Sequence, residues 1–290
     1  MIHTRHGIET FLHCRRKYFY KELEGIGDDT RKGTALIFGS LFDLAQQEYA
    51  VSRYVDGASH DKALQVAVDS WDCETVAALP DKERNLLEPL FNLWANWWDI
   101  NCPEVTAIQE QVTLTVPLPN GDTVQGTLDF LVETPAGWVL VENKTTGKLE
   151  HERLGLDFQL AFYAWLCYEA HFDLSAIWWI AVKKGPLNGR DRRPKHATDL
   201  IEREIIHKSI AGTRRFGKMM LTVVDEIHRM ADAGIDLALQ TPNPLSYRDD
   251  TSCIRNCEFY GLCESEWNSG PAAEEWLRSE WHKSKELRRA

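Results

Sequence analysis

The sequence predicts an α/β fold in which a mixed central sheet is flanked by helices. Three observations predict it. Apolar residues recur at helical spacing through the first 100 residues, strand-like alternation then begins near residue 110, and a long apolar helix separates this region from a further strand. Strands that alternate with helices along the chain are typical of sheets covered by helices.

Four stretches in the first 100 residues have apolar positions at helical spacing. They are TRHGIETFLHCRRKYFYKEL, LIFGSLFDLAQQEYAVSRYV, DKALQVAVDSW and KERNLLEPLFNLWANWWD. Apolar residues at this spacing share one face of an amphipathic helix. We therefore expect residues 1–100 to be mainly helical, with Cys14 in the first helical segment and Trp94, Trp97 and Trp98 in the core.

Three strand-like segments follow and predict an antiparallel meander. EQVTLTVPL alternates polar and apolar residues, PNGD is a hairpin signal, and TVQGTLDFLVE resumes the alternation before TPAG turns the chain into GWVLVENKT. LDFQLAFYAWLCYEAHF then predicts a buried helix, SAIWWIAVKK and LIEREIIHK two strands, and TRRFGKMMLTVVDEIHRMADAG a helix. We expect a single domain over residues 1–290, with a core at 104–235 and a cysteine-containing tail at 241–290.

Composition narrows the class of protein. The 290 residues are 43% hydrophobic and 27% charged, which is ordinary for a soluble globular protein. There is no uninterrupted apolar run of about 18 residues and no apolar stretch of the signal-peptide type at the start, so we expect a cytoplasmic protein without membrane contact. The net charge of −11 argues against a protein that coats nucleic acid through bulk basicity, but it is compatible with one local basic groove.

Charged residues interrupt two of the predicted strands. Asp129 lies on the second strand of the meander, and Glu142 and Lys144 lie two residues apart on the third, so these two project on the same face. A hairpin at TPAG brings Asp129 close to them. Carboxylates suit Mg²⁺ or Mn²⁺, and a lysine can orient water or stabilise charge on a phosphate, which together indicate phosphodiester hydrolysis. The alternative is an exposed ion pair at a sheet edge and an aspartate that begins a turn.

The next helix adds two residues that support the first interpretation. Gln159 and Tyr163 are four residues apart and therefore share a helical face. With them, GTLDFLVE, VENKTTGK and QLAFY resemble the RecB-type branch of the PD-(D/E)XK nuclease superfamily. The resemblance implies a restriction-endonuclease-like core and a metal-dependent nuclease, with metal ligands Asp129 and Glu142, catalytic Lys144, and Gln159 and Tyr163 positioning the site and the nucleic-acid strand. Tyr163 as a core aromatic is the alternative.

The same resemblance implies two further metal ligands. The main-chain carbonyl of Asn143 is one. RecB-type nucleases often carry a glycine followed four residues later by a metal-binding histidine, and in GSLFD the corresponding residues are Gly39 and Asp43. Asp43 would make the site all-oxygen and suited to Mg²⁺. A surface helix position is the alternative for Asp43, and Glu48 is a weaker substitute.

Three of the seven cysteines lie close together in CIRNCEFYGLC. Because the chain shows no export signal, metal ligation is expected for Cys253, Cys257 and Cys263 rather than a disulfide. Cys14 in FLHCRRKYFY resembles the early cysteine of RecB-type nucleases with an iron–sulfur cluster, such as CRISPR-associated and AddB-like exonucleases. The resemblance implies a 4Fe-4S cluster on these four cysteines, although the tail spacing is not identical to that of those nucleases. Zn²⁺ on the same four thiolates is the competing interpretation.

Two basic segments are candidates for contact with nucleic acid. KKGPLNGRDRRPKH, residues 183–196, is the most basic stretch of the chain and either grips a phosphate backbone or is a solvated loop. Arg15, Arg16 and Lys17 beside Cys14 are the other candidates.

The sequence thus predicts a Mg²⁺- or Mn²⁺-dependent deoxyribonuclease, and an exonuclease on single strands or duplex ends. Its context would be recombination, repair, or phage or CRISPR DNA processing, with a possible protein partner in recombination or CRISPR adaptation. Two alternatives stay open. One is a catalytically silent nucleic-acid-binding or assembly subunit, and the other is a zinc-stapled endonuclease.

Overall fold

The structure is a computed structural model that describes residues 1–26, 33–147, 154–186, 196–233, 257–270, 272, 275–276 and 278–280. The chain forms two compact units. Unit 1 comprises Met1–Ile2 and Lys32–Gly217, and unit 2 comprises His3–Arg31 and Lys218–Ala290. Among the described helices, none combines the length and the apolar character needed to cross a membrane.

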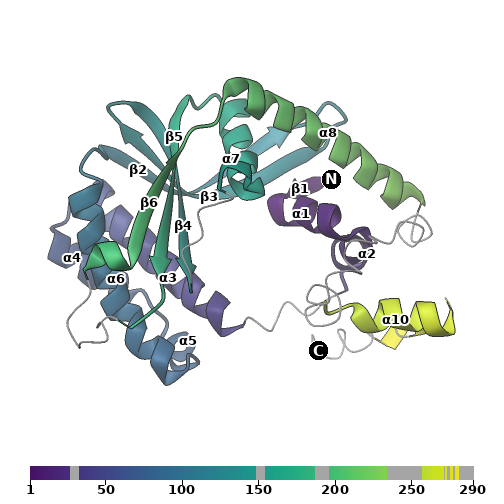
Figure 1. Ribbon diagram of the computed structural model, residues 1–290, viewed down its shortest axis with the longest axis horizontal. Helices are drawn as coiled ribbons and strands as arrows, with labels where there is room; N and C mark the ends of the chain where they lie inside the picture. Colours follow the sequence, from purple (N-terminus) through teal and green to yellow (C-terminus); the bar gives the residue numbers. More distant parts are fainter. Residues whose placement is uncertain are drawn as a thin grey trace. The chain divides into compact units, whose positions relative to one another are not determined.

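Unit 1 is built on the mixed sheet that the sequence predicts (Figure 1). The first three long strands form the expected antiparallel meander, the next is parallel to its neighbour, and the last is antiparallel again. In chain order these strands are β2 (Ala107–Pro117), β3 (Thr123–Thr134), β4 (Gly137–Thr146), β5 (Leu174–Lys183) and β6 (Ile201–Ile206). The order is β1-β3-β4-β5-β6 with β2 on β3, and β1 (Ile2–Thr4) is too short for its pattern to have been predicted.

Glycines close both hairpins of the meander. Gly121 between β2 and β3 has φ 86°, and Gly137 between β3 and β4 has φ 112°. Both values lie in the left-handed region that glycine adopts without a steric penalty. The Thr134 hydroxyl donates a hydrogen bond to the Gly137 carbonyl at 2.9 Å, which fixes the tight turn and, with it, the register of β3 and β4.

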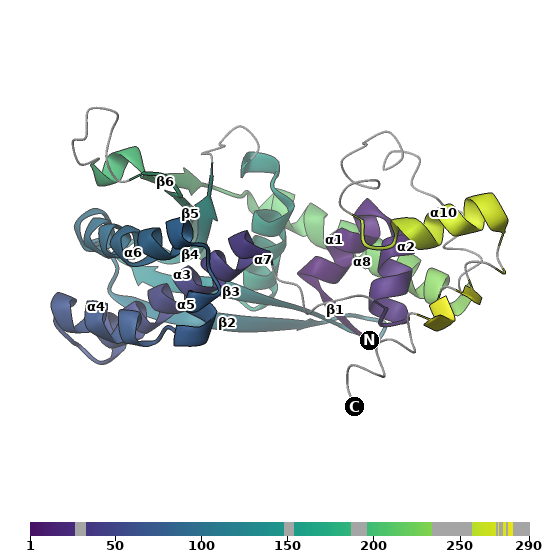
Figure 2. The same cartoon turned by 90° about the horizontal axis from the view of Figure 1, so that it is seen from below.

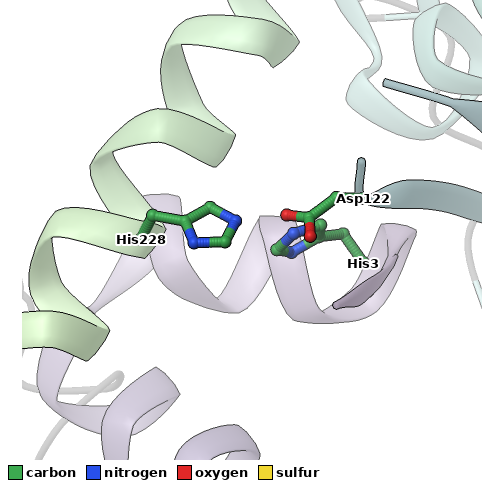
Figure 3. A group of neighbouring side chains, drawn as sticks. All are labelled: His3, Asp122 and His228. Atoms are coloured by element: carbon green, nitrogen blue, oxygen red, sulfur yellow. The ribbon is translucent and has the colours of Figure 1, made fainter. Parts of the chain in front are cut away.

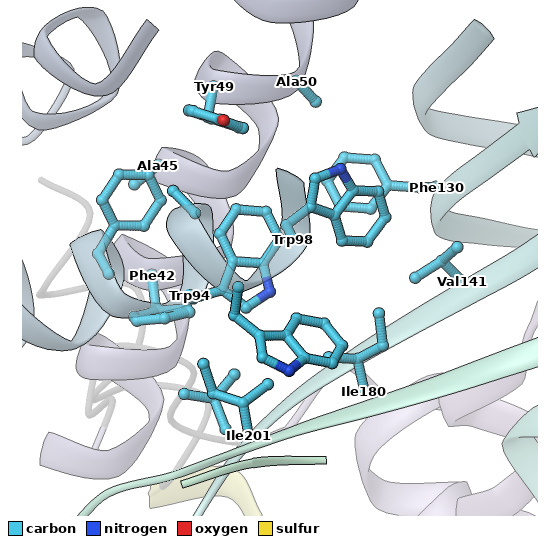
Figure 4. Close-up of a cluster of buried hydrophobic side chains, with 14 of the residues drawn as sticks. Phe42, Ala45, Tyr49, Ala50, Trp94, Trp98, Phe130, Val141, Ile180 and Ile201 are labelled. Carbon is cyan, nitrogen blue, oxygen red and sulfur yellow. The ribbon is translucent and has the colours of Figure 1, made fainter. Parts of the chain in front are cut away.

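One face of the sheet carries most of the hydrophobic core. Phe42, Trp94 and Trp98 pack with Phe130 and Val141, and all are at most 1% exposed (Figure 4). The helices on this face are α3 (Thr34–Ala50), α4 (His60–Asp69), α5 (Cys73–Ala77) and α6 (Asp81–Asn101), with a π-helical turn η2 (Val51–Val55) after α3. Burial of each large side chain contributes roughly 1.5–3 kcal/mol. The core position predicted for the tryptophans is confirmed.

The opposite face is covered by α7 (Phe158–Glu169), as Figures 1 and 2 show. Gly126 of β3 allows this close approach. A Cβ atom there would lie 2.6 Å from Leu166 and 3.1 Å from Phe162 and Tyr163. The start of α8 (Ile210–Ala233) packs on α7, and short 3-10 turns η3 (Leu154–Leu156) and η4 (Ala197–Asp199) complete the unit.

Unit 2 combines the chain start with its end. It contains α1 (Arg5–His13), α2 (Arg15–Tyr18), a π-helical turn η1 (Phe19–Leu23), the part of α8 from residue 218 and α10 (Tyr260–Ser269). Rings of Tyr20 and Phe259 lie 5.4 Å apart between centroids, and those of His3 and His228 lie 5.9 Å apart, edge to face (Figure 3). These contacts bring together segments that are more than 200 residues apart in the sequence.

The helical pattern expected near the chain start is interrupted at Cys14. This residue is extended, with φ −156° and ψ 110°, and its sulfur accepts a hydrogen bond from the main-chain N–H of Lys17 at 3.5 Å. Cys14 therefore ends α1 and caps α2. A side chain that satisfies an N–H at a helix start stabilises a break that apolar spacing alone does not reveal.

Candidate active site

The site begins where β3 and β4 diverge. Their pairing extends from Thr134 and Gly137 to Phe130 and Val141 and then stops. Two residues further along β4, the carboxylate of Asp129 accepts a hydrogen bond from the main-chain N–H of Asn143 at 2.9 Å, so a side-chain contact replaces the ladder. The hydrogen bond places Asp129 beside the end of β4.

Glu142 is the buried centre of the site. Its Oε1 atom lies 2.5 Å from the Lys144 ammonium and accepts a hydrogen bond from the Gln159 side chain at 2.6 Å. The Glu142 side chain is 1% exposed and that of Lys144 43%. Burial lowers the pKa of Lys144, but the attraction of Glu142 and its hydrogen bond, together with Asp129 and Tyr163, outweigh it, so the net pKa is raised. Lys144 therefore holds its proton and acts as a cation.

Helix α7 presents its polar residues from its first turn. Asp157 caps the helix by accepting the main-chain N–H of Leu160 at 2.9 Å. The Gln159 side chain, which bonds Glu142, also lies 3.4 Å from the Tyr163 hydroxyl. The predicted shared helical face is therefore confirmed. Tyr163 is 6% exposed, so its ring is buried while its hydroxyl faces Gln159.

Helix α3 contributes Asp43. Gly39, one turn earlier, lies against β4 so closely that a Cβ atom would be 3.4 Å from the Thr145 hydroxyl. The pKa of Asp43 is raised to about 7, mainly by burial and also by the charge of Asp129, although the charge of Lys144 opposes this rise. Asp43 thus shares an electrostatic environment with the strand residues. Glu48, a turn further along α3, makes no hydrogen bond or ion pair with these groups in the part of the chain that is described.

The donor set fits a hard divalent cation. The Oε2 atom of Glu142 is buried and accepts no hydrogen bond from the described residues, although its Oε1 atom is bonded. Asp129 and Asp43 supply further carboxylate oxygens, and the Asn143 carbonyl belongs to the same strand end. Oxygen ligands of this kind suit Mg²⁺ and Mn²⁺, and a cation would relieve the repulsion that raises the pKa of Asp43.

Three of the four predicted cysteine ligands come together in unit 2. Cys14, Cys257 and Cys263 are near enough for both other thiols to raise the pKa of Cys263. Burial is the main cause that raises this pKa to about 11, and a hydrogen bond and the charge of Arg16 oppose it. Half-buried thiols that lie together beside a guanidinium fit thiolate ligation of a metal or cluster, which removes their protons. Cys253 lies outside the described residues.

Some residues of the two basic segments lie in the part of the chain that the structure describes. Arg16 is 5% exposed and hydrogen-bonded to Cys263, so the prediction that it contacts a nucleic-acid strand is wrong. The Arg15 side chain pairs with Glu226 at 2.6 Å. In the loop after β5, Lys184 lies over the Phe38 ring at 5.2 Å, whereas the positions from 187 to 195 lie outside the described residues.

Sequence reasoning missed two residues that shape this site. Gly126 admits α7, and with it Tyr163, to the surface of β3, and Asp157 fixes the first turn from which Gln159 projects. The signal for Asp157 was available, since an aspartate before an apolar helix is a common N-cap. Gly126 carried a weaker signal, because a glycine within a strand marks a close approach without naming the partner.

An α/β fold with carboxylates and a lysine at two diverging strands defines the class of metal-dependent nucleases. In agreement, comparison with protein families matches residues 6–264 to the PD-(D/E)XK nuclease superfamily, and the chain belongs to this superfamily. Its members use divalent metals such as Mg²⁺ or Mn²⁺, and membership implies nuclease activity on a nucleic-acid substrate.

Other comparisons add little to this assignment. No curated protein matches the chain. Twenty-one chains of solved structures match it. One of them, described as "Crystal structure of SSO0001", is 13% identical over 62% of this chain and 74% of that chain, with a TM-score of 0.28, a likeness too low to carry an argument.

Proposed function

We propose that the protein is a RecB-type deoxyribonuclease that hydrolyses phosphodiester bonds with Mg²⁺ or Mn²⁺. The observation that carries the proposal is the convergence of Asp129, Glu142 and Lys144 at the ends of β3 and β4, with the Glu142 side chain only 1% exposed. A bound cation would polarise a phosphoryl oxygen and lower the pKa of a bound water.

The chain's own residues then have distinct roles in the proposed reaction. Asp129 and Glu142 hold the cation together with Asp43 and the Asn143 carbonyl. Lys144 keeps its proton on Nζ and stabilises negative charge that develops on the phosphate. Gln159 orients Glu142 through their hydrogen bond, and Tyr163, whose hydroxyl lies near Gln159, positions the strand. Lys183 at the end of β5 and Lys184 after it are proposed to contact the phosphate backbone.

The proposed cofactor of unit 2 is a 4Fe-4S cluster on Cys14, Cys253, Cys257 and Cys263. Its support is the proximity of the three described thiols and the similarity of the FLHCRRKYFY segment to iron–sulfur nucleases. A cluster held by both chain ends would serve as a structural staple, since metal binding contributes folding free energy. Zn²⁺ remains the second candidate because four thiolates also suit it. Both options require a reducing compartment, so we propose the cytoplasm.

An exonuclease that acts on single strands or duplex ends is the mode we propose, in recombination, repair, or phage or CRISPR DNA processing. A protein partner in recombination or CRISPR adaptation belongs to the same proposal. The silent nucleic-acid-binding subunit and the zinc-stapled endonuclease are the competing functions.

The test is a cleavage time course on protein prepared without oxygen. Linear, circular and single-stranded DNA with end labels are incubated with Mn²⁺ and either wild type or Lys144→Met, which removes the charge and keeps the apolar stem. We expect wild type to shorten linear and single-stranded DNA, circles to resist, and the variant to be inactive. Cleaved circles would favour an endonuclease. Equal digestion by both proteins would refute the role of Lys144, and absence of cleavage by both would favour the silent subunit.

A further inference from the structure

Unit 1 contains a cavity of about 240 Å³ whose lining includes none of the proposed catalytic residues. The C-terminal half of α7, the beginning of β5 and the beginning of α8 surround it. Ala164 and Tyr168 of α7, Ala176 of β5 and Thr213 of α8 are representative lining residues. Gln159, whose side chain bonds Glu142, lies in the first turn of α7.

The walls suit an aromatic ring. Tyr168 and Phe172 line the cavity, and both rings are held in place. Phe172 packs edge to face on Trp138 at 5.4 Å, and the Tyr168 hydroxyl accepts a hydrogen bond from Arg214 at 2.6 Å. An apolar cavity of about 150 Å³ is enough to hold benzene, so a cavity of about 240 Å³ has room for a larger ring system. Fixed aromatic walls also lower the ordering entropy that binding must overcome.

Two cations lie at this cavity, Lys208 as a lining residue and Arg214 through its hydrogen bond to the lining residue Tyr168. Lys208 lines it, and its ammonium donates to the main-chain carbonyl of Gly155 at 2.7 Å. Burial lowers the pKa of Lys208, against a weaker attraction by Asp157. Arg214 contacts the neutral Tyr168 side chain, and its guanidinium carbon lies 5.5 Å from the centre of that ring. Neither cation forms a salt bridge within the described residues. A partly desolvated cation on a neutral acceptor gains most from an anion.

One residue that lines the cavity disfavours the binding of a simple inorganic anion. Asp173 is exposed, and its carboxylate makes no hydrogen bond or ion pair with the described part of the chain. A carboxylate repels phosphate but accepts hydrogen bonds from amino or ring N–H groups. A ligand that combines an aromatic ring, N–H donors and an anionic group therefore matches the aromatic walls, Asp173 and Lys208 together.

We infer that this cavity is a binding site for a nucleoside monophosphate. The base lies between the walls formed by Tyr168 and Phe172, its N–H donors face Asp173, and the phosphate pairs with Lys208 and Arg214. The choice of a nucleotide over other aromatic anions rests on the proposed nuclease function, because an exonuclease that cleaves nucleic acid from its ends releases such molecules. The site would then retain or sense the product of the reaction at a distance from the catalytic groups.

A calorimetric titration separates this site from the catalytic one. Full-length protein with Lys144→Met is kept in chelator, so that neither cleavage nor cation-mediated phosphate binding contributes. We expect deoxyadenosine monophosphate to bind with one molecule per chain, and deoxyadenosine and inorganic phosphate each to bind more weakly. Adding Lys208→Met is expected to lower the affinity for the monophosphate by about tenfold or more, as loss of a charge-assisted hydrogen bond does.

Controls keep the test decisive. Lys62→Met removes an exposed lysine of α4 and should leave the affinity unchanged. Arg214→Gln, at an exposed position, provides a second variant if Lys208→Met unfolds, and it should also weaken binding. The inference would be overturned if the monophosphate did not bind, or if the Lys208 and Arg214 variants bound it as tightly as the protein without these substitutions. Binding of inorganic phosphate as tight as that of the monophosphate would also overturn it. Because cleavage is absent from this assay, failure of the proposed nuclease function would not alter its outcome.

Discussion

The acidic site of unit 1 and the cysteine set of unit 2 are organised in different ways. In unit 1, the hydrogen bonds on Asp129 and Glu142 come from a main-chain N–H at 2.9 Å and from Gln159 at 2.6 Å. In unit 2, the cysteine sulfurs are held by a 3.5 Å contact to the Lys17 N–H and by the hydrogen bond from Arg16. The sheet therefore preorganises the first set, whereas the second set would gain its cohesion from the proposed cluster or metal.

The largest expected effect tests the preorganised side of this comparison. Glu142→Gln removes the charge that pairs with Lys144 and that is proposed to hold the cation. We expect cleavage to fall by at least about a hundredfold, since one electrostatic contact in a transition state contributes about that much. The measurement is the initial rate of DNA cleavage with Mn²⁺. Glu133→Gln changes an exposed glutamate of β3 and serves as the control. An unchanged rate in Glu142→Gln would show that the buried carboxylate takes no part in the chemistry.

The next effect concerns the cysteine set. Cys263→Ser should release iron from protein purified without oxygen, and should lower the unfolding temperature by roughly 5–10 °C because metal binding contributes folding free energy. Iron content and thermal unfolding measure both. Cys73→Ser is the matched control, because Cys73 is exposed and belongs to unit 1. Full iron content in Cys263→Ser would contradict its role as a ligand, and wild-type protein that holds zinc without iron would favour the zinc alternative.

A smaller effect tests how tightly helix and sheet define the acidic site. In Gly126→Ala, the new Cβ would lie 2.6 Å from Leu166 and 3.1 Å from Tyr163. We expect a loss of about 1–3 kcal/mol in unfolding free energy from overpacking, together with slower cleavage because Tyr163 moves. Gly261→Ala is the control, since a Cβ atom there meets nothing within 4 Å. Denaturant unfolding and the initial rate of cleavage measure both effects. Wild-type stability and full activity in Gly126→Ala would show that the close approach is not required.

The smallest effect is a dependence on pH. Burial and Asp129 raise the pKa of Asp43 to about 7 in the folded chain, from an ordinary value of 3.8. The folded state therefore binds the proton more tightly, and its stability without metal falls as the pH rises from about 4 to about 7. Asp43→Asn should remove this decline, so its stability advantage over wild type grows toward neutral pH.

Thermal unfolding in chelator at several pH values measures this dependence. Asp56→Asn, at an exposed position, should leave the decline unchanged. If wild type and Asp43→Asn differ by a constant amount across the range, Asp43 is not the group that is repelled by Asp129.

Local patterns predicted the fold and the strand part of the site. The hairpin signal at TPAG fixes which residues of β3 and β4 face each other, so the approach of Asp129 to Glu142 followed from register. A spacing of four residues placed Gln159 and Tyr163 together, because residues at this spacing share one face of a helix. These features involve neighbours in the sequence or adjacent strands.

Long-range packing was less accessible. The helical pattern around Cys14 gave no indication that the chain becomes extended there, because the cap depends on a sulfur contact to Lys17. Arg16 looked exposed from its charge, yet it lies beside Cys263, which is remote in the sequence. Such contacts are set by tertiary structure rather than by periodicity.

The most direct test of the central claim is a titration of Mn²⁺ into full-length protein, with free ion followed by electron paramagnetic resonance. Asp129 accepts the Asn143 N–H, and Asp129→Asn retains an oxygen that can accept it while losing the charge. We expect wild type to bind Mn²⁺ and Asp129→Asn to bind it at least about tenfold more weakly. Equal affinity of the two proteins for Mn²⁺ would contradict the central claim.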